Sequence, residues 1–169
     1  MIGDRRRVIA EAESWLGTPY HHMGRLKGVG CDCLTLLAGV YHAAGVIPAP
    51  DIPFYPPDWH LHRSAERYLE GLVSHAYEVE GAEPGDVAVF KFGRCFSHGA
   101  IVTGWPQLIH AWHAGGVMRG DATQPLLAGR PVRFFSPFFI NETVSQSKKI
   151  FSGVSRKIFS PLFPSSELI

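Results

Sequence analysis

The fold is decided by the stretch Gly-Val-Gly-Cys-Asp-Cys-Leu-Thr-Leu-Leu, residues 28–37, where a glycine-rich loop gives way to a helix. Apolar residues continue at helical spacing, at Leu34, Leu37, Tyr41 and Ala44. Asp32 suits the N-cap, because its carboxylate accepts the free N–H groups of the first turn. Cys33 then begins the helix, where the partial positive charge favours a thiolate. Cys33 is therefore a candidate nucleophile, and a half-buried structural cysteine is the alternative.

The composition indicates one domain with a substantial core. The chain has 169 residues, of which 46% are hydrophobic, and a length of this order is typical of a single domain. The 18 glycines and 13 prolines favour turns and short strands over a helical bundle. A net charge of +1 gives no indication of a nucleic-acid surface, and three cysteines are too few for a disulfide framework.

The N-terminal segment Met-Ile-Gly-Asp-Arg-Arg-Arg, residues 1–7, is charged and has no apolar run. It therefore predicts no signal peptide, and we expect synthesis in the cytoplasm and another route to any site outside it. No stretch has the length of a membrane span, so stable membrane insertion is not expected.

Helical patterns come first along the chain and strand patterns second. Helices are predicted over residues 4–16, 33–45 and 61–72. Strands are predicted over 75–80, 86–92, 97–104, 107–113 and 130–135, with a weaker one at 117–119. A tight turn at Gly104-Trp105-Pro106-Gln107 makes a hairpin of the third and fourth strands. This order predicts an α+β domain over residues 1–140.

Residues 141–169 differ in composition from the rest and form a C-terminal extension. Ser and Lys are frequent there, and Lys-Ile-Phe-Ser occurs twice, at 149–152 and 157–160. A disordered terminus is one interpretation. A docking peptide for a partner protein is the other, and a membrane-surface helix is less favoured.

Two of the nine histidines stand apart because they lie among apolar neighbours inside the two predicted strands of one hairpin. His98 shares a strand face with Ala100 and Val102, and His110 shares one with Leu108 and Trp112. Two such residues on adjacent strands suggest a pair in which one ring orients the other. Zinc is a weaker interpretation, because the possible ligands have no zinc-type spacing; they are Cys31, Cys33, Cys95, His110 and His113.

Four short motifs follow one another between about residues 8 and 135. They are Trp15-Leu16-Gly17-Thr18-Pro19-Tyr20, Asp32-Cys33, the segment 83–90 (Glu-Pro-Gly-Asp-Val-Ala-Val-Phe), and Ser97-His98-Gly99-Ala100-Ile101-Val102 followed by Leu108-Ile109-His110-Ala111. In this order they resemble the motifs of the NlpC-type family of cell-wall peptidases, which are papain-like cysteine peptidases. The body looks most similar to the small peptidases of phage tail modules and gene transfer agents. The resemblance implies N-terminal helices, one carrying Cys33, packed on an antiparallel sheet of five or six strands.

The resemblance also implies a role for each matching residue. Cys33 would be the nucleophile, His98 the base that takes its proton, and His110 the group that orients the His98 ring. Tyr20, Asp32 and Ser97 would stabilise the oxyanion or position the substrate. No cofactor and no metal are implied.

The substrate implied by the resemblance is the stem peptide of peptidoglycan, cut between D-γ-glutamate and the diamino acid. Tail or hub proteins would be partners through residues 141–169, and the enzyme would act in the periplasm or cell wall from a virion. Leu34-Thr35 departs from the family's small residue and glycine, and is predicted to narrow the cleft. Residues 51–59 and Trp112 are predicted groove walls. A structural tail-tip subunit with this fold, and an amidase or acyltransferase, are the competing hypotheses.

Overall fold

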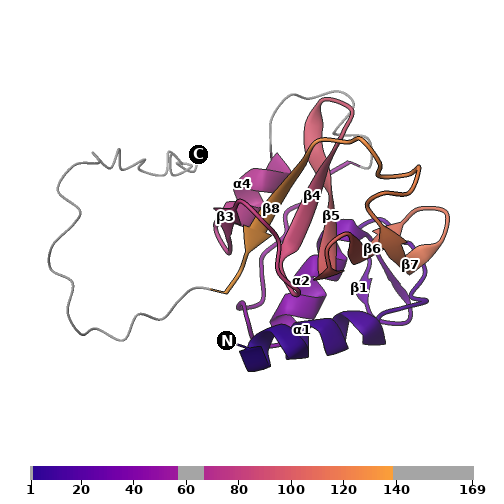
Figure 1. The fold of residues 1–169 in the computed structure, drawn as a ribbon. Helices are drawn as coiled ribbons and strands as arrows, with labels where there is room; N and C mark the ends of the chain where they lie inside the picture. The colour runs from indigo at the N-terminus through magenta and orange to yellow at the C-terminus, as the bar shows by residue number, and fades with distance from the viewer. Residues whose placement is uncertain (1, 57–66, 139–169) are drawn as a thin grey trace, which may run out of the picture.

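A computed structural model describes residues 2–56 and 67–138 of the protein. Three helices are described, α1 (Ile2–Ser14), α2 (Cys33–Ala43) and α4 (Arg67–Val73). The strands are β1 (Arg25–Leu26), β2 (Gly30–Cys31), β3 (Tyr77–Val79), β4 (Val87–Phe92), β5 (Cys95–Gly104), β6 (Gln107–Trp112), β7 (Gly116–Asp121) and β8 (Val132–Ser136), all labelled in Figure 1 apart from β2. The predicted helix over 61–72 is described only from Arg67 on, and the prediction for 141–169 lies outside the described residues.

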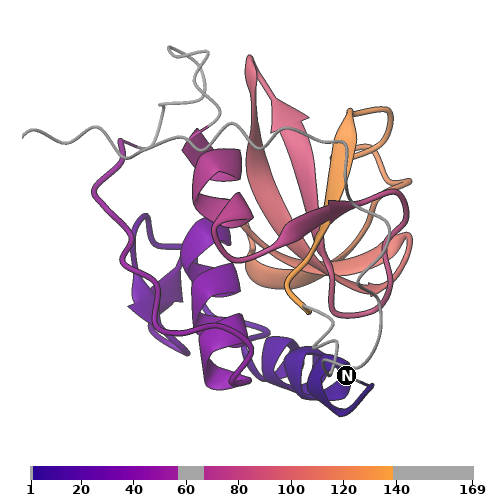
Figure 2. The same cartoon turned by 90° about the vertical axis from the view of Figure 1, so that its left-hand side faces the viewer.

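Six strands form one antiparallel sheet in the order β3-β8-β4-β5-β6-β7. The predicted hairpin is present as β5 and β6, with Gly104 paired to Gln107 across the turn. Figure 2 shows α2 and α4 following one another along one side of the sheet, while α1 crosses near the end of α2. The predicted α+β architecture, with the Cys33 helix packed on a five- to six-stranded antiparallel sheet, is therefore confirmed.

The sheet carries a cluster of buried residues on each face, and successive residues of a strand alternate between the two clusters. One face packs against the helices and forms the larger core, which includes Val8, Leu36, Val40, Val89, Ile101 and Ile109. The other face forms a smaller core with Ala88, Phe90, Ala100, Val102, Leu108 and Leu127. His98 and His110 follow the alternation of this smaller core, as predicted.

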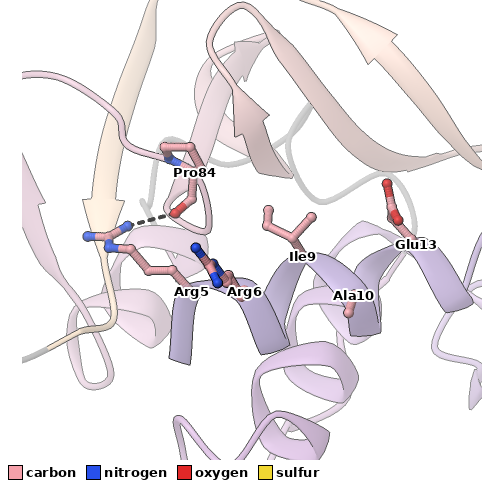
Figure 3. Close-up of a pocket in the computed structure, with 6 residues that line it drawn as sticks. All are labelled: Arg5, Arg6, Ile9, Ala10, Glu13 and Pro84. Carbon is pink, nitrogen blue, oxygen red and sulfur yellow. Dashed lines mark hydrogen bonds between the residues drawn. The ribbon is translucent and has the colours of Figure 1, made fainter. Parts of the chain in front are cut away.

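The side chain of Arg5 ties α1 to the sheet (Figure 3). Its guanidinium donates to the Pro84 carbonyl at 2.9 Å and to the buried Asp86 carboxylate at 2.8 Å. It also stacks on the Phe138 ring, 4.3 Å from the centroid. The surface hollow beside it holds none of the predicted site residues; its lining is Arg5, Arg6, Ile9, Ala10, Glu13 and Pro84.

The loop between α1 and α2 contains a small hairpin that the sequence did not predict. Strands β1 and β2 pair antiparallel, with Arg25 opposite Cys31, and Tyr20 forms an isolated bridge with Cys31. Gly30 lets the backbone of β2 approach His21 closely, because a Cβ atom on residue 30 would lie 2.6 Å from the Cβ of His21. Within the described residues, no helix is long and apolar enough to cross a membrane.

Candidate active site

The N-terminus of α2 is fixed by a full capping box. The Asp32 carboxylate accepts the N–H groups of Leu34 and Thr35 at 3.1 and 3.0 Å, and the Thr35 hydroxyl accepts the Asp32 N–H at 2.9 Å. Thr35 is thus turned inward by the cap and is 2% exposed. Of the Leu34-Thr35 pair, only Leu34 keeps exposed surface that could narrow a cleft.

Asp32 also joins two distant segments to this helix end. Its Oδ2 atom accepts the Met23 N–H at 2.8 Å and the Tyr55 hydroxyl at 2.6 Å, and the His22 Nδ1 atom lies 3.4 Å away. The His22 Nε2 atom in turn lies 2.8 Å from the Tyr55 carbonyl. Asp32 is 2% exposed, and both its oxygens are engaged by the protein, so it acts here by holding the loop, the helix and residues 51–56 together.

Cys33 rests as a neutral thiol. Its Sγ atom donates to the Ser97 carbonyl across 3.8 Å, so the backbone of Ser97 is what it contacts. Burial, followed by the negative charge of Asp32, raises the pKa of Cys33 to about 12, although N–H groups including those of Gly99 and Leu34 oppose the rise. Desolvation therefore opposes the thiolate that the helix-end charge favours, and the thiolate at Cys33 stays a prediction.

His98 and His110 form the predicted pair. The His98 Nε2 and His110 Nδ1 atoms are 2.8 Å apart, and the two rings are nearly perpendicular at 80°. His98 is 6% and His110 1% exposed. Among the described residues no hydrogen bond joins Cys33 Sγ to the His98 ring, although Sγ reaches the residue immediately before His98.

Both rings stay neutral over the physiological pH range. Burial, with the charges of His110 and Arg130, lowers the pKa of His98 to about 3, and burial lowers that of His110 to about 4. A neutral His110 can accept through Nδ1, and His98 can then donate from Nε2. We infer this tautomer because it leaves His98 Nδ1 unprotonated and available as a base.

Aromatic rings also flank His98. Phe92 and Trp112 meet it edge-on, with centroids 5.3 and 5.4 Å away. The Arg130 guanidinium covers Phe92 at 3.7 Å from the ring centroid. Trp112 keeps partial exposure, which fits its predicted place in a groove wall and limits water around His98.

Tyr20 is half-buried and forms an isolated bridge with Cys31, two residues before Cys33. Burial, and then the negative charges that Cys33 and Asp32 carry when they are ionised, raise the pKa of Tyr20 to about 12. Its phenol therefore stays protonated and is a potential hydrogen-bond donor. The Ser97 hydroxyl points elsewhere and donates to the Phe92 carbonyl at 3.5 Å.

Sequence reasoning missed the roles of Tyr55 and Tyr68 near this site. Tyr55 appeared only as one aromatic of a proline-rich segment, and Tyr68 as an apolar helix position. No local signal identifies either one, because each acts through contacts distant in sequence. In the parts of the chain that the structure describes, the possible zinc ligands do not gather into a group of three.

Solved structures are similar to this chain over most of its length. The NlpC/p60 domain of the peptidoglycan hydrolase SagA aligns with a TM-score of 0.51 and 23% identity, over 76% of this chain and 96% of that one. The peptidoglycan hydrolase RipB from Mycobacterium tuberculosis aligns with a TM-score of 0.55 and 20% identity, over 80% of this chain and 65% of that one. The chain has the NlpC/p60 fold.

A further similar structure is that of a protein without catalytic activity. RipD from Mycobacterium tuberculosis, a non-catalytic NlpC/p60 domain protein with a peptidoglycan-binding function, aligns with a TM-score of 0.54 and 18% identity, over 79% of this chain and 96% of that one. Against larger proteins of the same fold, the chain spans 39 to 43% of their length. No family model and no curated protein matches the sequence.

Proposed function

We propose that the protein is a cysteine peptidase that hydrolyses peptidoglycan stem peptides at the bond between D-γ-glutamate and the diamino acid. The observation that carries this proposal is the place of Cys33 at the start of α2. Its thiol donates a hydrogen bond to the backbone carbonyl of Ser97, the residue before His98, and the His98 ring is hydrogen-bonded to His110. SagA and RipB, which share the fold, are peptidoglycan hydrolases. The choice of the bond that is cut rests on the resemblance of the sequence motifs.

In the proposed reaction, His98 Nδ1 takes the proton from Cys33 Sγ as sulfur attacks the substrate carbonyl carbon. The backbone N–H at the start of α2 and the Tyr20 hydroxyl receive the oxyanion, and one such donor lowers the barrier by about 3 kcal/mol. His98 then gives its proton to the leaving amine. Water, deprotonated by His98, hydrolyses the thioester and returns the thiol. Throughout, His110 accepts from His98 Nε2 and holds the ring.

The resting thiol fits this scheme if substrate binding triggers proton transfer. A substrate in the cleft changes the surroundings of both Sγ and the His98 ring, and hydrogen bonds of catalytic groups commonly tighten in the substrate complex. We therefore propose that the free protein is held as a neutral pair and becomes an ion pair with peptide bound.

We further propose that the protein belongs to a phage tail or gene transfer agent and acts on the cell wall from that particle. The motif resemblance to the small peptidases of such particles supports this. Residues 141–169 are the proposed docking segment for tail or hub proteins. Deleting them should abolish incorporation into particles while leaving hydrolysis by the purified protein intact. Loss of hydrolysis with normal incorporation would contradict the docking role.

The second candidate function is a structural or peptidoglycan-binding subunit without activity. The raised pKa of the half-buried Cys33 thiol favours it, as does the fold shared with RipD, which is non-catalytic. In that case Cys33→Ala would be silent for infection or gene transfer, while deletion of 141–169 would not.

Mass spectrometry of muropeptides separates the two candidates. Purified protein is incubated with peptidoglycan under reducing conditions, beside Cys33→Ala and the matched control Cys95→Ala. We expect fragments cut after D-glutamate from the wild type and from Cys95→Ala, and none from Cys33→Ala. Fragments with a different new end would indicate an amidase, and intact peptidoglycan in every sample would favour the structural subunit.

A further inference from the structure

A buried hydroxyl lies beside the candidate nucleophile and is unused in the scheme above. Tyr68, in α4, is 5% exposed, and its Oη atom has no hydrogen-bond partner among the residues that the structure describes. Leaving a buried hydroxyl unpaired costs about 1–3 kcal/mol, so such a group calls for an explanation.

Gly99 shows where this hydroxyl sits. A Cβ atom on Gly99 would lie only 1.8 Å from Tyr68 Oη, so the hydroxyl fills the space that a side chain would take. The N–H of the same Gly99 points to Cys33 Sγ. Tyr68 Oη and Cys33 Sγ therefore both lie against one residue of β5.

Electrostatics agree with this placement. After burial, the charge that most raises the pKa of Tyr68 is that of Cys33, ahead of Asp32 and Tyr55. A nearby thiolate favours the protonated phenol, because the O–H group can donate to it.

We propose that the Tyr68 hydroxyl is held unpaired in the resting protein so that it can donate a hydrogen bond to the Cys33 thiolate once the proton has left. In the resting state Sγ is itself a donor, to the Ser97 carbonyl, and a neutral sulfur is a weak acceptor. When the proton moves from Sγ to His98 Nδ1, sulfur becomes an anion and a strong acceptor. The O–H···S bond then forms, and it weakens again when sulfur is acylated.

The hydroxyl serves the sulfur rather than the substrate oxyanion. Its oxygen is sealed from solvent, and a substrate oxygen in an open cleft does not reach such an atom. Cys33 keeps partial exposure, and its Sγ lies against the same Gly99, so the sulfur can meet the buried hydroxyl as well as a substrate. Tyr20 and the start of α2 remain the donors for the oxyanion.

Tyr68→Phe tests this inference, with Tyr41→Phe as the matched control. Tyr41 is also a buried tyrosine of the helical layer, but its hydroxyl donates to the Gly85 carbonyl at 2.8 Å. The rate of Cys33 alkylation by iodoacetamide is followed by peptide mapping over a range of pH, without peptidoglycan. We expect Tyr68→Phe to slow alkylation several-fold at each pH tested, because the thiolate loses a hydrogen bond that stabilises it.

Stability gives a second readout. Removing an unpaired hydroxyl should leave the melting temperature of Tyr68→Phe equal or higher, whereas Tyr41→Phe should melt lower and keep the wild-type alkylation profile. An unchanged profile for Tyr68→Phe would overturn the inference. A fall in hydrolysis without a change in alkylation would overturn it too, because it would place the hydroxyl on the substrate.

The inference rests on the proposed nucleophilic role of Cys33, but the two can fail separately. Alkylation needs no peptidoglycan, so a shifted profile in a protein that cuts no muropeptide would uphold the hydroxyl–thiolate bond and contradict the peptidase. If the wild-type protein hydrolyses muropeptides but Tyr68→Phe leaves the alkylation of Cys33 unchanged, the peptidase is upheld and the hydroxyl–thiolate bond is contradicted.

Discussion

Asp32 and Tyr68 approach Cys33 from two regions of the molecule, and they differ in how their polar atoms are satisfied. Each Asp32 oxygen accepts hydrogen bonds from protein donors that span the loop, the helix and residues 51–56. The Tyr68 hydroxyl is also buried, but it has no hydrogen-bond partner among the described residues. A saturated group fixes structure, and an unsaturated one beside a nucleophile is available when charge develops. We infer that the first region holds the site and the second responds to it.

The largest effect is expected from His98→Ala, because His98, like Tyr68, acts on the proton and the charge of Cys33 rather than on the fold. Without the base that takes the Cys33 proton, kcat for muropeptide hydrolysis should fall about 10³- to 10⁴-fold. The matched control is His42→Ala, because His42 is exposed on the surface of α2. Steady-state kinetics with purified muropeptides measure both. Activity of His98→Ala within tenfold of the wild type would contradict the role of His98.

In the region around Asp32, where the polar atoms are all hydrogen-bonded, the largest effect is expected from Asp32→Ala. This change removes the helix cap and leaves the partly buried Tyr55 hydroxyl and three N–H groups, those of Met23, Leu34 and Thr35, without their acceptor. The free energy of unfolding should therefore fall by about 3–5 kcal/mol. Urea denaturation measures it. Asp51→Ala, at an exposed position, should stay within about 0.5 kcal/mol of the wild type. Equal stabilities of the two variants would refute the anchoring role.

Acid should weaken the molecule through the histidine pair. The folded-state pKa values are about 3 for His98 and about 4 for His110, below the ordinary 6.5. Between pH 6.5 and 4 the unfolded chain therefore binds more protons, and stability falls with decreasing pH by up to about 1.4 kcal/mol per pH unit for each ring. The stability of His110→Gln should fall less steeply over this window. Parallel pH curves for the two proteins would argue against a neutral pair.

The smallest effect is expected from Tyr55→Phe, which removes one donor from Asp32 and leaves the others. We expect a loss of about 1 kcal/mol in the free energy of unfolding, with an unchanged alkylation profile of Cys33. This pairs with Tyr68→Phe, where the profile should move and the stability should not fall. Opposite outcomes for the two tyrosines are the sharpest form of the comparison.

The sequence predicted those parts of the molecule that depend on local pattern. The strands around His98 and His110 alternate clearly, the Asp32 cap has its expected chemistry, and the motif order gave the architecture. The hairpin of β1 and β2 was missed, because two-residue strands carry no alternation. The effect of burial on the pKa of Cys33 was not foreseen, because burial depends on how distant segments such as β5 pack against the start of α2. Tyr55 and Tyr68 were missed since their partners lie far away in the chain.

The most direct test of the account is whether Cys33 becomes acylated by substrate. Wild-type protein is mixed with purified muropeptide, quenched in acid within a turnover and digested for mass spectrometry. We expect the peptide that contains Cys33 to carry the mass of the acyl fragment as a thioester that hydroxylamine removes. Products formed without this adduct, and formed equally by Cys33→Ala, would contradict Cys33 as the nucleophile.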